Sequence, residues 1–363
     1  MSFDAQALSP LFELTPDAVL CVGQDRRILF ANPSAELMLG ARPGARAEDL
    51  LSDVVLSDPA ERFVTAARLR GRDARISAVR VEGVSLYTIE FISERKVNEI
   101  SVHYGALKEM GSDLFSARLA IDAIVKSTGA EKDEKLRAYS GILYRSYYRM
   151  KRLQEHMALA IGLQGKRLPF NPRLTDLSAL CLTLCDTAAA LVRPMGIEIV
   201  FEAPEGDCRG FADHALMETL LLNLLSNSLL HTSAGDTVRV SLSRQDRRFV
   251  LAVDDPGEGI SPLLLPKLFS SPPEADRTDT AAGAGLGLLI VRGIAELHGG
   301  ALIMESRENA GTRIRVWLPQ PDAEDLQKLC QPETPYRVDG LNTSLTELSV
   351  VLDTSWYDHR FFD

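Results

Sequence analysis

The feature that most constrains the fold of this 363-residue chain is a pair of asparagines inside an apolar helical stretch, METLLLNLLSNSLL. Asn223 and Asn227 are four residues apart, so both carboxamides lie on one face of a helix, about one turn apart. A buried amide without a partner costs about 1 to 3 kcal/mol, so the pair needs partners. A metal ion with phosphate would satisfy both side chains, and a hydrogen-bonded structural pair is the alternative.

A strand and a glycine loop follow the asparagine pair. The run Leu251–Asp254 predicts a buried strand that leads directly into the segment DPGEGI, which contains Asp255, Gly257 and Gly259. Glycines let the backbone approach a ligand closely, and an ionised Asp255 can accept a hydrogen bond from an exocyclic amine. Adenine carries such an amine.

Two further segments complete the set. Residues 282–288, AGAGLGL, precede the helical stretch LLIVRGIAELHGG, so free backbone N–H groups and the positive end of a helix can meet phosphate. Gly311 and Thr312 begin the strand TRIRVWLP, which predicts a tight turn beside the same pocket.

In this order the four segments resemble the ATPase module shared by histidine kinases, DNA gyrase, Hsp90 and MutL-type proteins, the Bergerat fold. The resemblance implies that ATP and Mg²⁺ bind here, with Asn227 binding Mg²⁺, Asn223 supporting the metal and the phosphates, and Asp255 reading adenine. The other positions that it implies for ATP binding are Gly257, Gly259, Gly283, Gly285, Leu286, Gly287 and Thr312. Among these, Gly283, Gly285 and Gly287 would hinge a lid over the triphosphate.

Two departures from the histidine kinase pattern predict weaker nucleotide binding or turnover. Leu230 stands where these kinases commonly have a lysine or arginine, and the segment SSPPEADRTDT replaces the usual second phenylalanine after Phe269.

Residues 96–165 predict a helical hairpin. Apolar residues recur at three-four spacing on both helices, and the charged segment EKDE after Gly129 separates the two. The stripe on the first helix comprises Met110, Leu114, Ala117, Ile121 and Ile124. A hairpin with a full apolar stripe is expected to pair with a second copy as a four-helix bundle, so we expect a homodimer.

The hairpin and the linker after it resemble those of sensor histidine kinases, but the phosphoacceptor histidine is missing. By this resemblance Ser112 holds the acceptor position, while Asp113 and Ser116 keep the acid and hydroxyl that orient water for dephosphorylating a partner response regulator. Two solvated polar residues on an outer helix face are the alternative for Asp113 and Ser116. None of His103, His156, His231 and His298 has the placement of an acceptor.

Residues 1–95 predict a small α/β domain. Ala18–Val22 and Arg27–Phe30 are predicted to form a hairpin, a helix begins after Asn32, and a strand runs from Ser85 to Ile92. The segment PDAVLCVGQDRRILFANPSAELMLG resembles the opening of a PAS sensor domain. Its ligand is unknown, and a domain with no ligand is the alternative.

The fold class expected is therefore α+β and multidomain: a PAS-like domain (1–95), a dimerisation hairpin (96–165), a Bergerat-type α/β sandwich that binds ATP (166–320) and a C-terminal extension (321–363). The extension contains a strand-like run, 345–352, and aromatic residues that either pack on a neighbouring domain or dock a partner.

Composition limits the classes of partner that the chain is expected to bind. The formal charge of −10 argues against a nucleic-acid footprint, and no run approaches the roughly 20 apolar residues of a membrane span, so a cytoplasmic protein is expected. Three functions stay open. The first is an ATP-binding kinase homologue that signals through a response regulator or partner kinase without conventional self-phosphorylation. The others are an active kinase that uses Ser112 or a non-standard histidine, and a nucleotide-independent dimeric scaffold.

Overall fold

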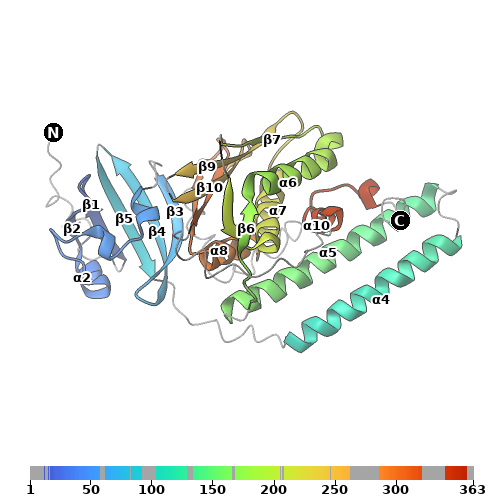
Figure 1. Ribbon diagram of the computed structural model, residues 1–363, viewed down its shortest axis with the longest axis horizontal. Helices are drawn as coiled ribbons and strands as arrows, with labels where there is room; N and C mark the ends of the chain where they lie inside the picture. Colours follow the sequence, from blue (N-terminus) through green and yellow to red (C-terminus); the bar gives the residue numbers. More distant parts are fainter. Residues whose placement is uncertain are drawn as a thin grey trace.

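The computed structural model describes residues 12, 15, 17–57, 62–81, 83–91, 104–128, 134–165, 168–204, 206, 208–245, 247–261, 286–320 and 340–357. Three parts follow one another in Figure 1: a strand-rich N-terminal part, a central sheet covered by helices, and a long helical hairpin that projects from them. A short C-terminal helix lies between the hairpin and the central helices.

The N-terminal part is an antiparallel sheet with the strand order β2-β1-β5-β4-β3 and short helices against it. Its elements are β1 (Ala18–Val22), β2 (Ile28–Ala31), α2 (Pro33–Leu39), η2 (Ala47–Asp49), α3 (Asp53–Ser57), β3 (Arg62–Leu69), β4 (Arg72–Val81) and β5 (Val84–Phe91). The predicted hairpin, the helix after Asn32 and the late strand are confirmed. Asn32 is fully buried, and its Oδ1 accepts hydrogen bonds from the backbone N–H groups of Val19 and Ala35, both at 2.9 Å. It therefore joins β1 to the first turn of α2.

The hairpin consists of α4 (Tyr104–Thr128) and α5 (Glu134–Gln164). The apolar stripe predicted for α4 divides between two faces: Leu114 is buried against α5, whereas Met110 and Ile124 are 39% and 55% exposed. Two buried tyrosines of α5 meet α4, since Tyr144 donates a hydrogen bond to Asp122 at 2.6 Å and Tyr148 accepts one from Arg118 at 3.1 Å. The hairpin thus closes partly through polar contacts.

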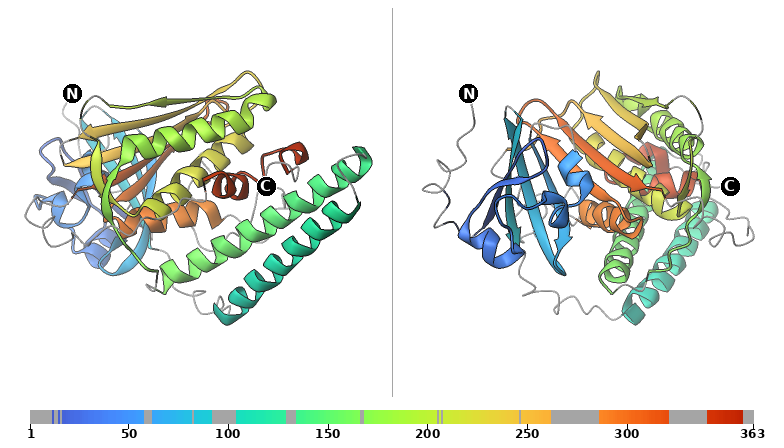
Figure 2. Two further views of the ribbon diagram at one scale, coloured as in Figure 1. Left: turned by 45° about the vertical axis from the view of Figure 1, so that its right-hand side comes forward. Right: turned by 60° about the vertical axis from the view of Figure 1, so that its left-hand side comes forward.

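The central part is an α/β sandwich. Its elements are β6 (Arg173–Asp176), α6 (Leu177–Val192), η4 (Arg193–Met195), β7 (Glu198–Glu202), β8 (Arg209–Ala212), α7 (His214–Leu230), β9 (Thr237–Gln245), β10 (Arg248–Asp255), α8 (Leu286–Leu297), β11 (Ala301–Ser306) and β12 (Thr312–Pro319). The strand order is β11-β12-β10-β9-β7, and α6, α7 and α8 cover one face of this sheet (Figure 2). Alternate strand residues, such as Leu251 and Val253, share the main core with these helices.

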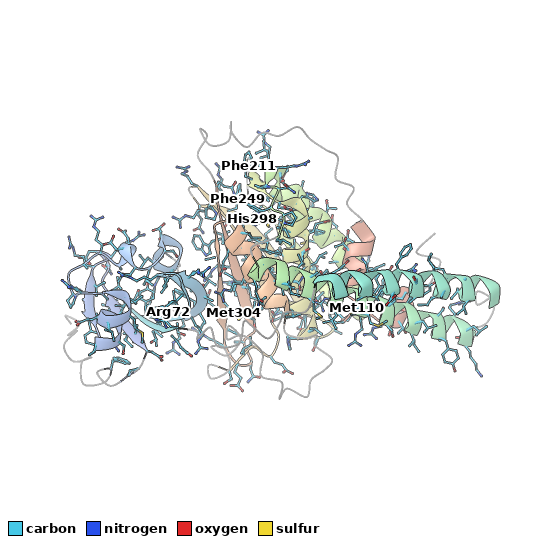
Figure 3. All side chains as sticks on the ribbon, turned by 90° about the horizontal axis from the view of Figure 1, so that it is seen from below. Arg72, Met110, Phe211, Phe249, His298 and Met304 are labelled. Atoms are coloured by element: carbon cyan, nitrogen blue, oxygen red, sulfur yellow. The ribbon has the colours of Figure 1, made fainter. Side chains whose placement is uncertain are left out.

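The two sheets join edge to edge into one of ten strands. Ile303 and Met304 of β11 pair with Thr65 and Val64 of β3 in antiparallel register. Met304 is labelled in Figure 3, at the side of the sandwich that faces the N-terminal part. These parts are separate domains in the division expected from the sequence, and no local sequence pattern indicates the pairing.

The C-terminal segment folds as α10 (Gly340–Glu347), a turn and the short helix η7 (Thr354–Tyr357). The strand predicted for 345–352 is therefore wrong. The run does not alternate between buried and exposed residues as a half-buried strand would. Leu345, Leu348 and Leu352 are all buried, because the helix and the turn after it pack into the core. Tyr357 is also buried, so packing on a neighbouring domain holds for this aromatic residue, whereas Phe361 and Phe362 lie outside the described residues.

One helix in the described part of the chain, Leu177–Met195, is long and apolar enough to cross a membrane, with a mean hydropathy of 1.3. Its Leu180 and Leu184 are buried in the core of the sandwich. A core helix of a globular domain passes the same test of length and composition, so the finding is weak support for a span.

Candidate nucleotide-binding site

The asparagine pair lies in the middle of α7, among the apolar residues of the main core. The helix begins at Asp213, whose side chain accepts a hydrogen bond from the backbone N–H of Leu216. Asn223 is fully buried, and Asn227 is half-buried. The Nδ2 of Asn223 donates to the backbone carbonyl of Thr219 at 2.9 Å, which fixes the orientation of the carboxamide.

The oxygen of the Asn223 carboxamide is the unsatisfied end. Among the described residues, Asn223 Oδ1 has no hydrogen-bond partner although it is buried. A Cβ atom added to Gly287, the second residue of α8, would lie 2.9 Å from this oxygen and 3.6 Å from Asn227 Oδ1. The oxygen of Asn223 and the carboxamide group of Asn227 therefore both lie near the N-terminal end of α8. Amide oxygen is a ligand type that Mg²⁺ accepts, and an orphaned buried acceptor is what a metal or its bound water would satisfy.

Asp255 marks the other end of the candidate site, where β10 ends beside β12. Its Oδ1 accepts a hydrogen bond from the backbone N–H of Gly257 at 3.1 Å. Burial raises the pKa of the Asp255 carboxyl above its ordinary value, although hydrogen bonds from Gly257, Ser228 and Thr312 act in the opposite direction. Ser228 follows Asn227 in α7, so the asparagine helix also holds the carboxylate.

The glycines of the Asp255 loop are required by contacts within the protein itself. A Cβ atom at Gly257 would lie 2.4 Å from the backbone oxygen of His231, and one at Gly259 would lie 1.9 Å from that of Arg307. Gly259 also has a φ of +66°, in the region that favours glycine. From the sequence, these glycines are expected to let a ligand approach; in the structure they also allow the loop to pack against the segments around His231 and Arg307.

The lid predicted around residues 282–288 falls mostly outside the described residues, and so do Gly283 and Gly285. The described part begins at Leu286, the first residue of α8, and includes Gly287. Thr312 lies opposite Asp255 in the pairing of β12 with β10. The structure thus brings together Asn223, Asn227 and Gly287 at one end, and Asp255, Gly257 and Thr312 at the other.

Known proteins share these segments. Residues 212–322 match the family described as histidine kinase-, DNA gyrase B- and HSP90-like ATPase, and residues 7–75 match the PAS domain. Histidine protein kinase DivJ of Caulobacter vibrioides is 38% identical over 125 residues, which are 34% of this chain and 21% of DivJ. Sensor histidine kinase YvrG of Bacillus subtilis is 30% identical over 168 residues, which are 46% of this chain and 29% of YvrG.

The chain is similar to bacterial sensor histidine kinases and carries the ATPase domain of that group together with a PAS domain. It spans 21% and 29% of the length of these two curated relatives. Among solved structures, full-length ShkA in complex with AMPPNP has a TM-score of 0.47 at 22% identity, covering 60% of this chain and 46% of ShkA. Histidine kinase ThkA in complex with the response regulator TrrA has a TM-score of 0.41 at 20% identity, covering 86% of this chain and 98% of ThkA.

The predicted acceptor region of this sensor kinase homologue lies on α4. Ser112 is within the helix, but its side chain is outside the described residues. Asp113 and Ser116 are exposed, and Leu114 between them is buried against α5. The structure therefore places Asp113 and Ser116 on an accessible part of the hairpin, away from its core.

A buried polar cluster beside the asparagine pair was missed by the sequence analysis. Glu347 of α10 contacts Arg152 and His156 of α5 and also Asn223 of α7. His156 was discounted as an acceptor by its position on the second helix, and the structure adds that it is only 5% exposed. No local pattern reveals the cluster, because its members come from three segments far apart in the sequence.

Proposed function

We propose that this sensor histidine kinase homologue binds ATP with Mg²⁺ and signals without conventional self-phosphorylation, with Ser112 in the position of the acceptor histidine. The nucleotide assignment is carried by the orphaned Oδ1 of Asn223, which faces the start of α8 beside Asn227. A structural hydrogen-bond pair would have satisfied that oxygen within the protein.

Each end of the site has a separate task in this proposal. Asp255 accepts a hydrogen bond from the adenine amine, Asn227 binds the metal through its amide oxygen, and Asn223 supports it. The N-terminal N–H groups of α8, together with the positive end of its dipole, favour the negative phosphates. Mg²⁺, when bound, supplies the charge that neutralises the triphosphate.

The proposal also assigns a role to each of the four domains expected from the sequence. Residues 1–95 form the sensor domain, with an unknown ligand or none, 96–165 the dimerisation hairpin, 166–320 the ATP-binding domain and 321–363 an extension. The chain acts as a homodimer, and its partner is a response regulator or another kinase. The apolar residues left exposed on α4 and α5, such as Met110 and Leu143, support the dimer.

One observation and one chemical argument bear on the loss of conventional self-phosphorylation, and the observation concerns transfer within a single chain. In Figure 1, α5 lies between α4 and the helices of the ATP-binding domain, so in this arrangement the acceptor helix does not face the nucleotide site of its own chain. A serine hydroxyl near neutral pH also needs a base before it can replace imidazole as a nucleophile. Exposed Asp113 is the neighbouring candidate for that base, which keeps a serine kinase as the second function.

The test is to incubate the full chain with γ-labelled ATP and Mg²⁺ and to measure the acid and base stability of any label. We expect binding of ATP and no acid-labile label. An acid-labile label lost in His156→Gln would overturn the proposal. An acid-stable label lost in Ser112→Ala, but kept in the control Ser146→Ala on the exposed side of α5, would establish the serine kinase instead. Failure to bind any nucleotide would favour the scaffold.

A further inference from the structure

The C-terminal segment, residues 340–357, is built into the boundary between the hairpin and the ATP-binding domain. In Figures 1 and 2, α10 lies between α5 and α7. Leu345, Leu348, Leu352 and Tyr357 are at most 2% exposed and belong to the same core as α6 and α7. Burial of several large apolar side chains makes this segment part of the folded core.

The segment is also held by directional contacts along α5. The ring of Tyr357 lies 5.3 Å from that of Tyr148, and its hydroxyl donates to the backbone oxygen of Leu345 at 2.9 Å. Arg145 donates from Nε to the backbone oxygen of Ser349 at 3.3 Å. These contacts fix the segment in one register on α5, which places Glu347 opposite the asparagine helix.

Glu347 stands at the centre of the buried cluster. Its carboxylate accepts a hydrogen bond from Arg152 Nε at 3.1 Å and lies 2.9 Å from His156 Nε2. It also accepts from Asn223 Nδ2 at 3.2 Å. Glu347, Arg152 and His156 are 3%, 7% and 5% exposed.

The carboxyl of Glu347 is held in its charged form. Burial works against ionisation, but hydrogen bonds and charge from His156 and Arg152 outweigh it, so its pKa lies below the ordinary value. A buried ion pair adds little net stability compared with apolar packing, while loss of one member leaves an uncompensated charge. The cluster therefore specifies how α5, α7 and α10 sit together more than it stabilises the fold.

Asn223 links this cluster to the nucleotide site. Its Nδ2 contacts Glu347, and its Oδ1 faces Gly287 and the start of α8. The negative charge of Glu347 is thus separated from the place proposed for the phosphates by the amide group of Asn223. Glu347 also neutralises the positive charge of Arg152, which would otherwise attract the phosphates. Like charges in a partly buried site repel strongly, because water screens them little.

We propose that residues 340–357 are an internal inhibitor of nucleotide binding, with Glu347 as the charge that opposes the triphosphate while the segment ties α5 to the ATP-binding domain. This inference rests on the proposed function, since it requires ATP to bind beside Asn223. Docking of the segment then weakens the binding of Mg-ATP. By thermodynamic linkage, binding of Mg-ATP weakens the docking of the segment by the same factor.

The first experiment compares wild type with Glu347→Gln by titration calorimetry, using Mg-ATP and adenosine as probes. The variant keeps the shape of the side chain and removes its charge. We expect the Kd for Mg-ATP to fall on the order of tenfold, the size of a moderate coupling between sites, while the Kd for adenosine is unchanged. Asp353→Asn is the matched control, because Asp353 is an exposed carboxylate of the same segment. It should leave both constants unchanged.

The second experiment needs no variant, in case Glu347→Gln does not fold. Hydrogen exchange of wild type, followed by mass spectrometry, should show faster exchange across 340–357 when Mg-ATP is added, and no change with adenosine. If wild type binds Mg-ATP but neither the exchange nor the affinity responds as expected, the inhibitor is ruled out and the proposed function stands. If neither probe binds to any form, the proposed function itself has failed.

Discussion

The hydroxyl of Thr65 in β3 donates a hydrogen bond of 2.5 Å to the backbone carbonyl of Leu302 in β11, across 237 residues of sequence. The bond crosses the short pairing that joins the sheet of the PAS part to that of the ATP-binding part. Neighbouring residues of β3 serve both sides, since Phe63 belongs to the core of the PAS part and Val64 to the main core. A change in the PAS sheet can therefore reach β11 without passing through the hairpin.

Thr65→Val should lower the free energy of unfolding by about 1 to 3 kcal/mol, because it removes the donor to a buried carbonyl while keeping the shape of the side chain. Urea titration followed by circular dichroism measures this. The control is Thr88→Val in β5, which is half-buried and lies in the PAS sheet away from β11. Equal losses in both variants would show that the contact with Leu302 contributes nothing specific.

Asp255→Asn should abolish ATP binding and leave the fold intact. The substitution removes the charged acceptor proposed for the adenine amine but keeps the volume of the side chain. Calorimetric titration measures binding, and circular dichroism checks the fold. Asp254→Asn is the matched control, because Asp254 is the preceding residue of β10 and is bonded to Arg313. Wild-type affinity in Asp255→Asn would mean that the base pocket lies elsewhere.

Binding of adenosine should weaken as the pH falls, starting at a higher pH than an ordinary aspartate would give. The reason is that burial raises the pKa of Asp255, and the ionised carboxylate is a stronger hydrogen-bond acceptor for the amine than the protonated carboxyl. Protonation therefore weakens the acceptor as the pH approaches this raised value from above. Adenosine has no phosphates to titrate, so its Kd measured across mildly acidic pH reports the base pocket. A Kd that stays constant down to the ordinary pKa of aspartate would contradict the assignment.

Much of the fold follows from local sequence patterns. The apolar strand before Asp255, the asparagine helix and the two hairpin helices each carry a periodicity that depends only on their own residues. The long-range arrangement does not. The pairing of Thr65 with Ile303 involves two strands whose sequences satisfy any antiparallel neighbour.

The residues of the candidate site also differ in whether local sequence patterns predict them. Asn223, Asn227 and Asp255 could be chosen by spacing and residue type, whereas Glu347 could not. It lies in the run LTELSVVL, which has the apolar content of a strand, and its partners Arg152 and His156 belong to a helix more than 190 residues earlier. Its role depends on tertiary placement, which no local period encodes.

Leu143→Glu should dissociate the homodimer. Tyr139, Leu143, Met150 and Leu153 lie four, seven and three residues apart along α5, as in a heptad pattern, and are 40% to 62% exposed in one chain, which fits a seam for a second copy. A glutamate there would bury an unpaired charge, at a cost of several kcal/mol. Sedimentation measures the change. Leu114 belongs to the apolar stripe predicted on the first helix, but it is buried within the hairpin, so its substitution would disturb the monomer.

The control for Leu143→Glu is Leu37→Glu. Leu37 is an apolar residue of α2 in the PAS part, 86% exposed, so the same substitution adds the same charge outside the proposed seam. It should leave the sedimentation coefficient unchanged. A monomeric wild-type chain, or equal dissociation in both variants, would contradict the four-helix bundle.

Gly287→Ala should weaken the binding of Mg-ATP by about tenfold or more, through overpacking worth about 1 to 3 kcal/mol. The new Cβ would lie 2.9 Å from Asn223 Oδ1, and Asn223 is fully buried and held by Thr219 and Glu347, so it has no room to yield. The amide oxygen proposed to support the metal would be displaced or covered.

Gly293→Ala provides the control in the same helix. Its Cβ would lie 2.7 Å from a terminal methyl carbon of Leu163, and such a flexible side chain can move aside at small cost. Both variants change the helix propensity of α8 equally. Calorimetric titration with Mg-ATP and with adenosine then separates the two ends of the site. We expect Gly287→Ala to weaken Mg-ATP and spare adenosine, because Asp255 is untouched, and Gly293→Ala to spare both. Equal affinity of wild type and Gly287→Ala for Mg-ATP would show that the phosphates do not lie against the asparagine pair.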